Sequence, residues 1–106
     1  RTKTTSKLVY FQYGGSLSLS SNIANQLSYE FPKKIIVVVY IKGEVANISL
    51  RGEGDVRSLT LEAINGIEGA SGGGHQQATG AKLSVSDLPK FKEKIEGLVE
   101  RGVGIN

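Results

Sequence analysis

The sequence contains no cysteine, methionine or tryptophan, and it has a single histidine, His75. Without cysteine, neither a disulfide framework nor a thiolate metal site can form, and nothing points to a secreted protein. The longest apolar run, residues 35–41, is far too short to cross a bilayer as a helix. The first residues also lack the apolar segment of a signal peptide. We therefore expect a cytoplasmic protein with no membrane segment.

Acidic and imidazole ligands are also scarce. The only aspartates are Asp55 and Asp87, which stand far apart in the sequence, and His75 has no metal-ligating neighbours. A two-metal hydrolytic site needs several carboxylate or imidazole ligands that converge on ions about 3.5–4 Å apart. We therefore expect no metal or other cofactor in this chain and no catalytic residue. The formal charge of +3 mildly favours a polyanionic partner, although the lysines are scattered along the sequence.

The length of 106 residues fits one domain that can bury a core of its own. Residues 1–6 are polar and rich in threonine, so we expect a flexible tail or the remnant of a linker. We expect the folded domain to cover residues 7–106. The abrupt start of the sequence indicates a piece of a larger protein.

Four segments have the pattern of β-strands. Residues 7–13 are rich in aromatic and β-branched side chains and end at a glycine pair. The run 35–41 is typical of a central strand that is covered on both faces. After a tight reversal, residues 45–51 alternate between apolar and polar side chains, which predicts a hairpin with Ser49 and Arg51 on the polar face. Residues 81–85 form a fourth, short candidate.

Three segments have the apolar period of a helix. The first begins at Ser20 or Ser21, either of which can cap it, and ends before Pro32. The second begins at Asp55, which complements a helix N-terminus, and the third begins at Ser86. The combined order predicts an α/β fold with a small mixed sheet of about four to five strands and helices packed on it. The order of the strands stays open.

The segment 71–81 is the strongest candidate for a binding site. It contains three consecutive glycines, Gly72, Gly73 and Gly74, followed by His75. Glycine lets another molecule approach the main chain closely, and consecutive N–H groups in such a loop can hold an anion such as phosphate. His75 can add a side-chain donor at the same place. A purely structural turn is the alternative interpretation.

Arg51 is the best candidate for a phosphate clamp, because its charged guanidinium presents a fork of donors that matches two phosphate oxygens. An arginine in a surface ion pair is the alternative. Ser49 is expected to orient Arg51 or to contact the phosphate. Thr79 is expected to cap the glycine loop and is included among the phosphate-binding residues. The small residues Ala78 and Gly80 are expected to let the loop pack against the hairpin.

The spacing of these residues resembles a known family. The matching residues are Asn47-Ile48-Ser49-Leu50-Arg51, then Gly72-Gly73-Gly74-His75, then Ala78, Gly80 and Ala81, and finally Leu88-Pro89-Lys90-Phe91. This pattern is similar to the DHH-associated C-terminal domain, the small lobe of the DHH phosphoesterase superfamily, which includes RecJ-like exonucleases and oligoribonuclease-like phosphodiesterases. The resemblance extends over most of the chain.

The resemblance implies a function for the whole protein and a limit for this chain. In the family, the large lobe binds catalytic manganese or magnesium, and the small lobe holds the phosphates of the substrate. This sequence has no Asp-His-His triplet. The resemblance therefore implies a substrate-binding lobe that is inactive alone. Its partners would be single-stranded nucleic acid or a short oligonucleotide and a DHH catalytic lobe of the same parent chain, and an exposed sheet edge would allow a homodimer.

Two other functions remain open. The first is a non-catalytic module for nucleic-acid binding or replication assembly, of the RecJ-like type that has lost its metal ligands. The second is the related lobe of alanyl-transfer-RNA synthetases, which is disfavoured because that version has a glycine run without the histidine present here.

Overall fold

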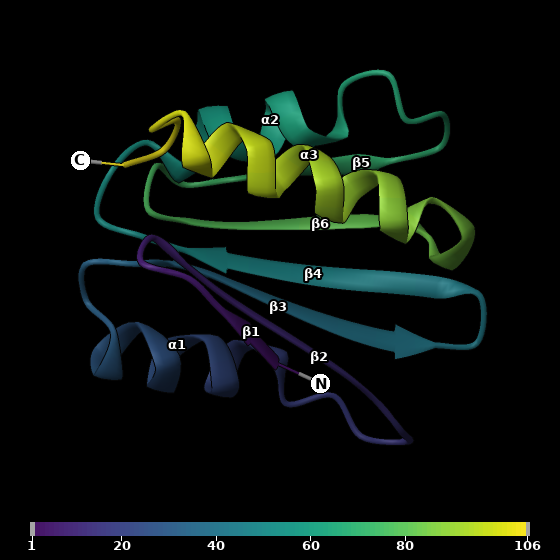
Figure 1. The fold of residues 1–106 in the computed structure, drawn as a ribbon. Helices are drawn as coiled ribbons and strands as arrows, with labels where there is room; N and C mark the ends of the chain where they lie inside the picture. Colours follow the sequence, from purple (N-terminus) through teal and green to yellow (C-terminus); the bar gives the residue numbers. More distant parts are fainter. Residues whose placement is uncertain (1, 106) are drawn as a thin grey trace.

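A computed structural model describes residues 2–105 as one mixed six-stranded sheet with helices on both faces (Figure 1). The strands are β1 (Thr2–Thr4), β2 (Leu8–Gly14), β3 (Ile35–Lys42), β4 (Val45–Arg51), β5 (Ser71–Gly74) and β6 (Ala78–Ser84). The helices are α1 (Ser20–Glu30), α2 (Val56–Ile64) and α3 (Leu88–Glu100), the last preceded by a 3-10 turn, η1 (Val85–Asp87). The predicted α/β class is confirmed.

The sheet has more strands than the four to five predicted, because two segments expected to be irregular are extended. Thr2–Thr4, assigned to a flexible tail, pairs antiparallel with β2 as an edge strand. The glycine segment also differs from the predicted loop, since Ser71–Gly74 is strand β5 at the opposite edge. Both are short and lack apolar alternation, so the sequence carries no strand signal for them.

The strand order is β1-β2-β3-β4-β6-β5. Strand β2 continues through α1 into β3 and pairs with it in parallel, as a crossover helix requires. The remaining neighbours pair antiparallel, beginning with the predicted hairpin of β3 and β4. Gly43 in the turn of that hairpin has φ of 62°, a conformation that favours glycine.

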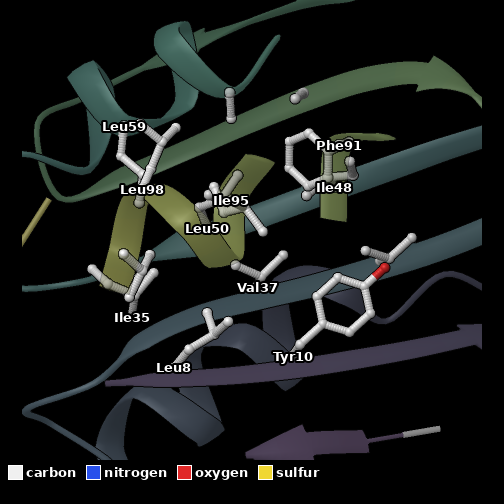
Figure 2. Close-up of a cluster of buried hydrophobic side chains, with 14 of the residues drawn as sticks. Leu8, Tyr10, Ile35, Val37, Ile48, Leu50, Leu59, Phe91, Ile95 and Leu98 are labelled. Carbon is white, nitrogen blue, oxygen red and sulfur yellow. The ribbon is translucent and has the colours of Figure 1, made fainter. Parts of the chain in front are cut away.

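One face of the sheet carries the main core. Alternate side chains of β2, β3, β4 and β6 point toward α2 and α3 (Figure 2). Phe91 and Ile95 of α3 lie among them and are fully buried. We call this the closed face. Its continuous apolar packing supplies most of the burial that stabilises the domain.

The opposite face is covered only in part. Helix α1 packs through Ala24 on Val9, Ile36 and Val38 of β2 and β3, which form a second and smaller cluster. On the closed side α2 packs on β5 and β6, whereas on the opposite side α1 packs mainly on β3 and β4. The two halves of the sheet therefore differ in how far a helix covers them on this side. We call the part formed by β4, β6 and β5 the open face.

No helix within residues 2–105 combines the length and the apolar character that crossing a membrane requires.

Candidate functional site on the open face

Register and alternation determine which side chains lie on the open face. In an antiparallel sheet, directly paired residues project to the same side. Three rows of paired residues cross β4, β6 and β5 here: Arg51–Ala78–His75, Ser49–Gly80–Gly73 and Asn47–Lys82–Ser71. Small or polar side chains occupy all nine positions, which is the opposite of the closed face.

Arg51 and His75 therefore lie in one row, separated by Ala78. The His75 N–H donates to the Ala78 carbonyl at 2.9 Å, which continues the β5–β6 ladder through His75. Neighbouring strands are about 4.8 Å apart, so the two backbones are about 10 Å apart. Two long side chains that project to the same side can contact one phosphate group between them.

The Arg51 guanidinium is held in place by two hydrogen bonds. Its Nε donates to Asn25 Oδ1 on α1 at 3.0 Å, and its Nη1 donates to the Leu50 carbonyl at 2.9 Å. Partial burial lowers the pKa of Arg51 from its ordinary value, but arginine stays charged at neutral pH. The acceptor that orients Arg51 is thus Asn25, whereas Ser49 was the residue expected to do so.

The turn that carries His75 is fixed by the start of α2. The Gln76 carbonyl accepts the N–H groups of Val56 at 2.9 Å and Arg57 at 3.2 Å, the first two residues of that helix. Gln77 Nε2 donates to the Glu53 carbonyl at 2.7 Å, which ties the turn to the segment after β4. These bonds hold the turn beside the end of β4, where Arg51 lies.

The three consecutive glycines differ in whether the surrounding structure requires glycine at their positions. A Cβ on Gly74 would lie 2.6 Å from the Ala78 carbonyl oxygen, and φ of Gly74 is 138°. A Cβ on Gly72 would lie 2.9 Å from the Gly80 carbonyl oxygen and close to the Ile64 side chain. Gly73 meets nothing within 4 Å and faces the open side. Packing thus requires glycine at positions 72 and 74 only.

The extended conformation also changes which glycine amides are accessible. Because His75 donates to Ala78, the alternation of an antiparallel ladder turns the Gly73 N–H toward β6. The N–H groups of Gly72 and Gly74 then point to the free edge of the sheet. The predicted concave loop of consecutive amides is therefore wrong, and the donors for a ligand are separated along an edge.

Thr79 was expected among the ligand-binding residues, and the structure corrects this. Its side chain is 5% exposed and lies on the closed face, where its hydroxyl is 2.6 Å from that of Thr60 on α2. Thr60 in turn donates to the Val56 carbonyl at 2.8 Å. Thr79 alternates with Ala78 and Gly80 along β6, so it cannot share their face. It joins β6 to α2 instead.

Two cavities border both α1 and β4 on the open face, and we call them together the groove. One cavity of about 450 Å³ is lined by Asn47 and Ser49 of β4, Tyr40 and the first residues of α1. The other, of about 600 Å³, is lined by Arg51, Asn25 and Tyr29 among others. Both volumes are in the range of small-molecule sites. Ser49 thus lines the groove one row away from Arg51.

Two tyrosines of β2 make contacts within the domain. Tyr10 is fully buried on the closed face. Tyr13 packs on Tyr40 with ring centroids 5.1 Å apart, and its hydroxyl accepts the N–H of Leu19 at 2.8 Å. Leu19, rather than the predicted serine, is the N-cap of α1.

Sequence reasoning missed Asn25 and Tyr29, which bring α1 into the site. Both lie on a helix whose apolar period was used only to place its buried side, and neither belongs to a motif. The available signal was their i, i+4 spacing, which places two polar or amphipathic side chains on one face. No group of three histidine, cysteine or acidic residues within residues 2–105 is arranged to hold a metal ion.

Comparison with known proteins identifies the family. The sequence model of the DHHA1 domain matches residues 4–101. The chain belongs to the DHHA1 domain family. DHHA1 domains are accessory domains of DHH-family proteins, so the resemblance seen in the sequence is confirmed.

One relative of this DHHA1 domain is a much longer protein. An uncharacterized protein of Methanocaldococcus jannaschii is 27% identical over 104 residues, which cover 93% of this chain but 23% of that protein. The chain therefore spans less than a quarter of the length of this curated relative.

Solved structures share the fold. The C-Ala domain of Aquifex aeolicus alanyl-tRNA synthetase matches with a TM-score of 0.66 at 15% identity, over 98% of this chain and 99% of that domain. A pGpG-specific phosphodiesterase of Vibrio cholerae matches with a TM-score of 0.65 at 13% identity, over 95% of this chain and 36% of the enzyme. At such identities these matches show the architecture alone, so they do not discriminate between synthetase and phosphodiesterase functions.

Proposed function

We propose that this DHHA1 domain is the substrate-binding lobe of a DHH-family phosphoesterase and holds a phosphate of single-stranded nucleic acid or a short oligonucleotide on its open face. Arg51 clamps the phosphate, and His75 approaches it from the same row of the sheet. Ser49 and the edge amides of Gly72 and Gly74 supply further donors. The manganese or magnesium ions and the residues that hydrolyse the substrate belong to a DHH lobe outside this chain.

The observation that carries the proposal is the common row of Arg51 and His75 on the open face, beside α1. A positively charged fork, held by Asn25, faces a groove lined mainly by neutral polar side chains. Phosphate contacts position a nucleic acid without reading its bases. The geometry thus supports recognition of a phosphorylated chain and leaves the choice of base to other contacts.

The expected affinity of the domain alone is low. Two or three charge-assisted hydrogen bonds contribute about 1.5–3 kcal/mol each. They must offset an association cost of at least about 4 kcal/mol. Binding at millimolar concentrations or weaker follows. Attachment to a catalytic lobe would raise the effective concentration of the site, so the domain would act efficiently only within its parent protein.

The direct test is hydrolysis by the longer protein that carries this domain. Arg51→Ala is expected to lower kcat/KM for a short phosphorylated oligonucleotide by about 10- to 100-fold, because a charge-assisted contact is worth about 1.5–3 kcal/mol. His75→Ala is expected to lower it by a smaller factor. The matched control is Arg57→Ala, because Arg57 is an exposed arginine at the start of α2.

Unchanged kcat/KM in both Arg51→Ala and His75→Ala, with the domain still folded by circular dichroism, would contradict the proposal. A parent protein that lacks the DHH metal ligands but still binds oligonucleotides through Arg51 would favour the non-catalytic nucleic-acid-binding module instead.

A further inference from the structure

Tyr29 is the most exposed large hydrophobic side chain in the described part of the chain. Its exposed fraction is 88%, compared with 40% for Leu61 on α2. Within residues 2–105 it forms no aromatic pair and no hydrogen bond with its side chain. Burial of an aromatic ring is strongly favourable. Because the Tyr29 ring is exposed to water, it contributes little to the stability of the domain.

The position of Tyr29 relates it to Arg51. Tyr29 and Asn25 are four residues apart on α1 and therefore neighbours on one side of the helix. Asn25 accepts the hydrogen bond from Arg51 Nε at 3.0 Å. Tyr29, Asn25 and Arg51 all line the cavity of about 600 Å³ at this end of the groove.

The other walls of this cavity suit a nucleoside. Pro32 adds a second apolar surface, and Gln77 reaches the cavity from the turn that carries His75. The volume is within the range of sites that accept a small molecule of nucleotide size. A ring beside a phosphate clamp is the arrangement that single-strand binding proteins use, since every base offers a π-face for stacking.

We propose that Tyr29 is the stacking surface for the nucleobase that adjoins the phosphate held by Arg51, so that α1 forms the base-binding wall of the site. This inference rests on the proposed function and assigns a base subsite to it. Stacking is tolerant of base identity, so the subsite selects nucleotides over other phosphate esters without selecting a sequence.

The test separates base binding from phosphate binding with two probes. The first is a 5′-phosphorylated deoxyadenosine dinucleotide, and the second is ribose 5-phosphate, which has a phosphate and a sugar but no base. Binding of each to this chain is followed by two-dimensional nuclear magnetic resonance over a millimolar titration. Tyr29→Ala is expected to weaken binding of the dinucleotide about tenfold and to leave binding of ribose 5-phosphate unchanged.

Two further variants complete the design. Tyr29→Phe keeps the ring and is expected to bind both probes as the unaltered chain does. Leu61→Ala removes a partly exposed apolar side chain from α2 and serves as the matched control, with no expected effect on either probe.

The outcomes distinguish this inference from the function on which it rests. If Arg51→Ala weakens both probes while Tyr29→Ala weakens neither, the base subsite is absent and the phosphate site stands. If Tyr29→Ala weakens both probes equally, Tyr29 supports the site without stacking on a base, and the inference is overturned. If the unaltered chain binds both probes with the same affinity, no base contact contributes, so the inference is overturned and the phosphate site stands.

Discussion

The two faces of the sheet in this DHHA1 domain differ in the side chains that they carry. The closed face packs apolar side chains of four strands against α2 and α3. The open face carries His75 together with Arg51 and Ser49, and the latter two line the groove. The same strands contribute to both, because alternate residues of β4 and β6 point to opposite sides. Substitutions one position apart are therefore expected to affect either stability or binding, with little overlap.

The largest effect is expected on the closed face. Phe91 is fully buried among residues of the sheet and α2, so Phe91→Ala is expected to destabilise the domain by about 3–5 kcal/mol. Arg51→Ala on the open face is expected to change stability by no more than about 1 kcal/mol, since it removes two partly exposed hydrogen bonds. Urea unfolding monitored by circular dichroism measures both. Equal losses would show that the faces are not energetically separate.

A smaller effect compares two neighbouring glycines. Gly74→Ala places a Cβ 2.6 Å from a backbone oxygen at φ of 138°, so it is expected to destabilise the domain by about 2 kcal/mol. Gly73→Ala points into open space and is expected to change stability by less than about 0.5 kcal/mol. Thermal unfolding of the two variants decides the comparison. A Gly73→Ala variant as unstable as Gly74→Ala would contradict the assignment of Gly73 to the open face.

The smallest effect concerns the helix that supports the turn. Asp55 caps α2 by accepting hydrogen bonds from the Ser58 N–H at 3.0 Å and the Ser58 hydroxyl at 2.7 Å, and these bonds lower the pKa of its carboxyl. A lowered folded-state pKa stabilises the fold above the unfolded-state value of about 4. That contribution is lost as the pH falls through the folded-state pKa.

Asp55→Ala is therefore expected to lower the unfolding temperature modestly at pH 7, with the difference shrinking as the pH falls below about 4. Asp87→Ala is the matched control, because Asp87 precedes α3 and makes no side-chain capping bond. A difference from the unaltered chain that does not depend on pH would show that the carboxylate charge plays no part in the cap.

Much of the fold could be predicted because long strands and amphipathic helices carry periodic signals. The alternation of residues 45–51 gave the bounds of β4, and Asp55 was correctly expected at the start of α2. The face that carries Ser49 and Arg51 followed from the same alternation. These properties are local, because the polarity of each side chain indicates whether its position is buried or exposed.

The remainder depends on pairing between distant segments. β5 has three glycines and no apolar side chain, so only its register with β6 makes it a strand and turns the Gly73 amide inward. Thr79 was expected to cap the glycine loop at the phosphate site, but it lies on the closed face, where its hydroxyl is bonded to that of Thr60 of α2. Asn25 lies on a helix far from β4 in sequence, and only the crossover between β2 and β3 brings it to Arg51.

The attachment of the Gln76 carbonyl to the first two amides of α2 has a mechanical consequence. Any displacement of the backbone at this turn would have to break the hydrogen bonds that Gln76 accepts from the first turn of α2. The backbone of the turn is therefore expected to be rigid. If the proposed phosphate site is correct, its backbone is already arranged before a ligand binds, and the entropy lost on association falls mainly on the ligand.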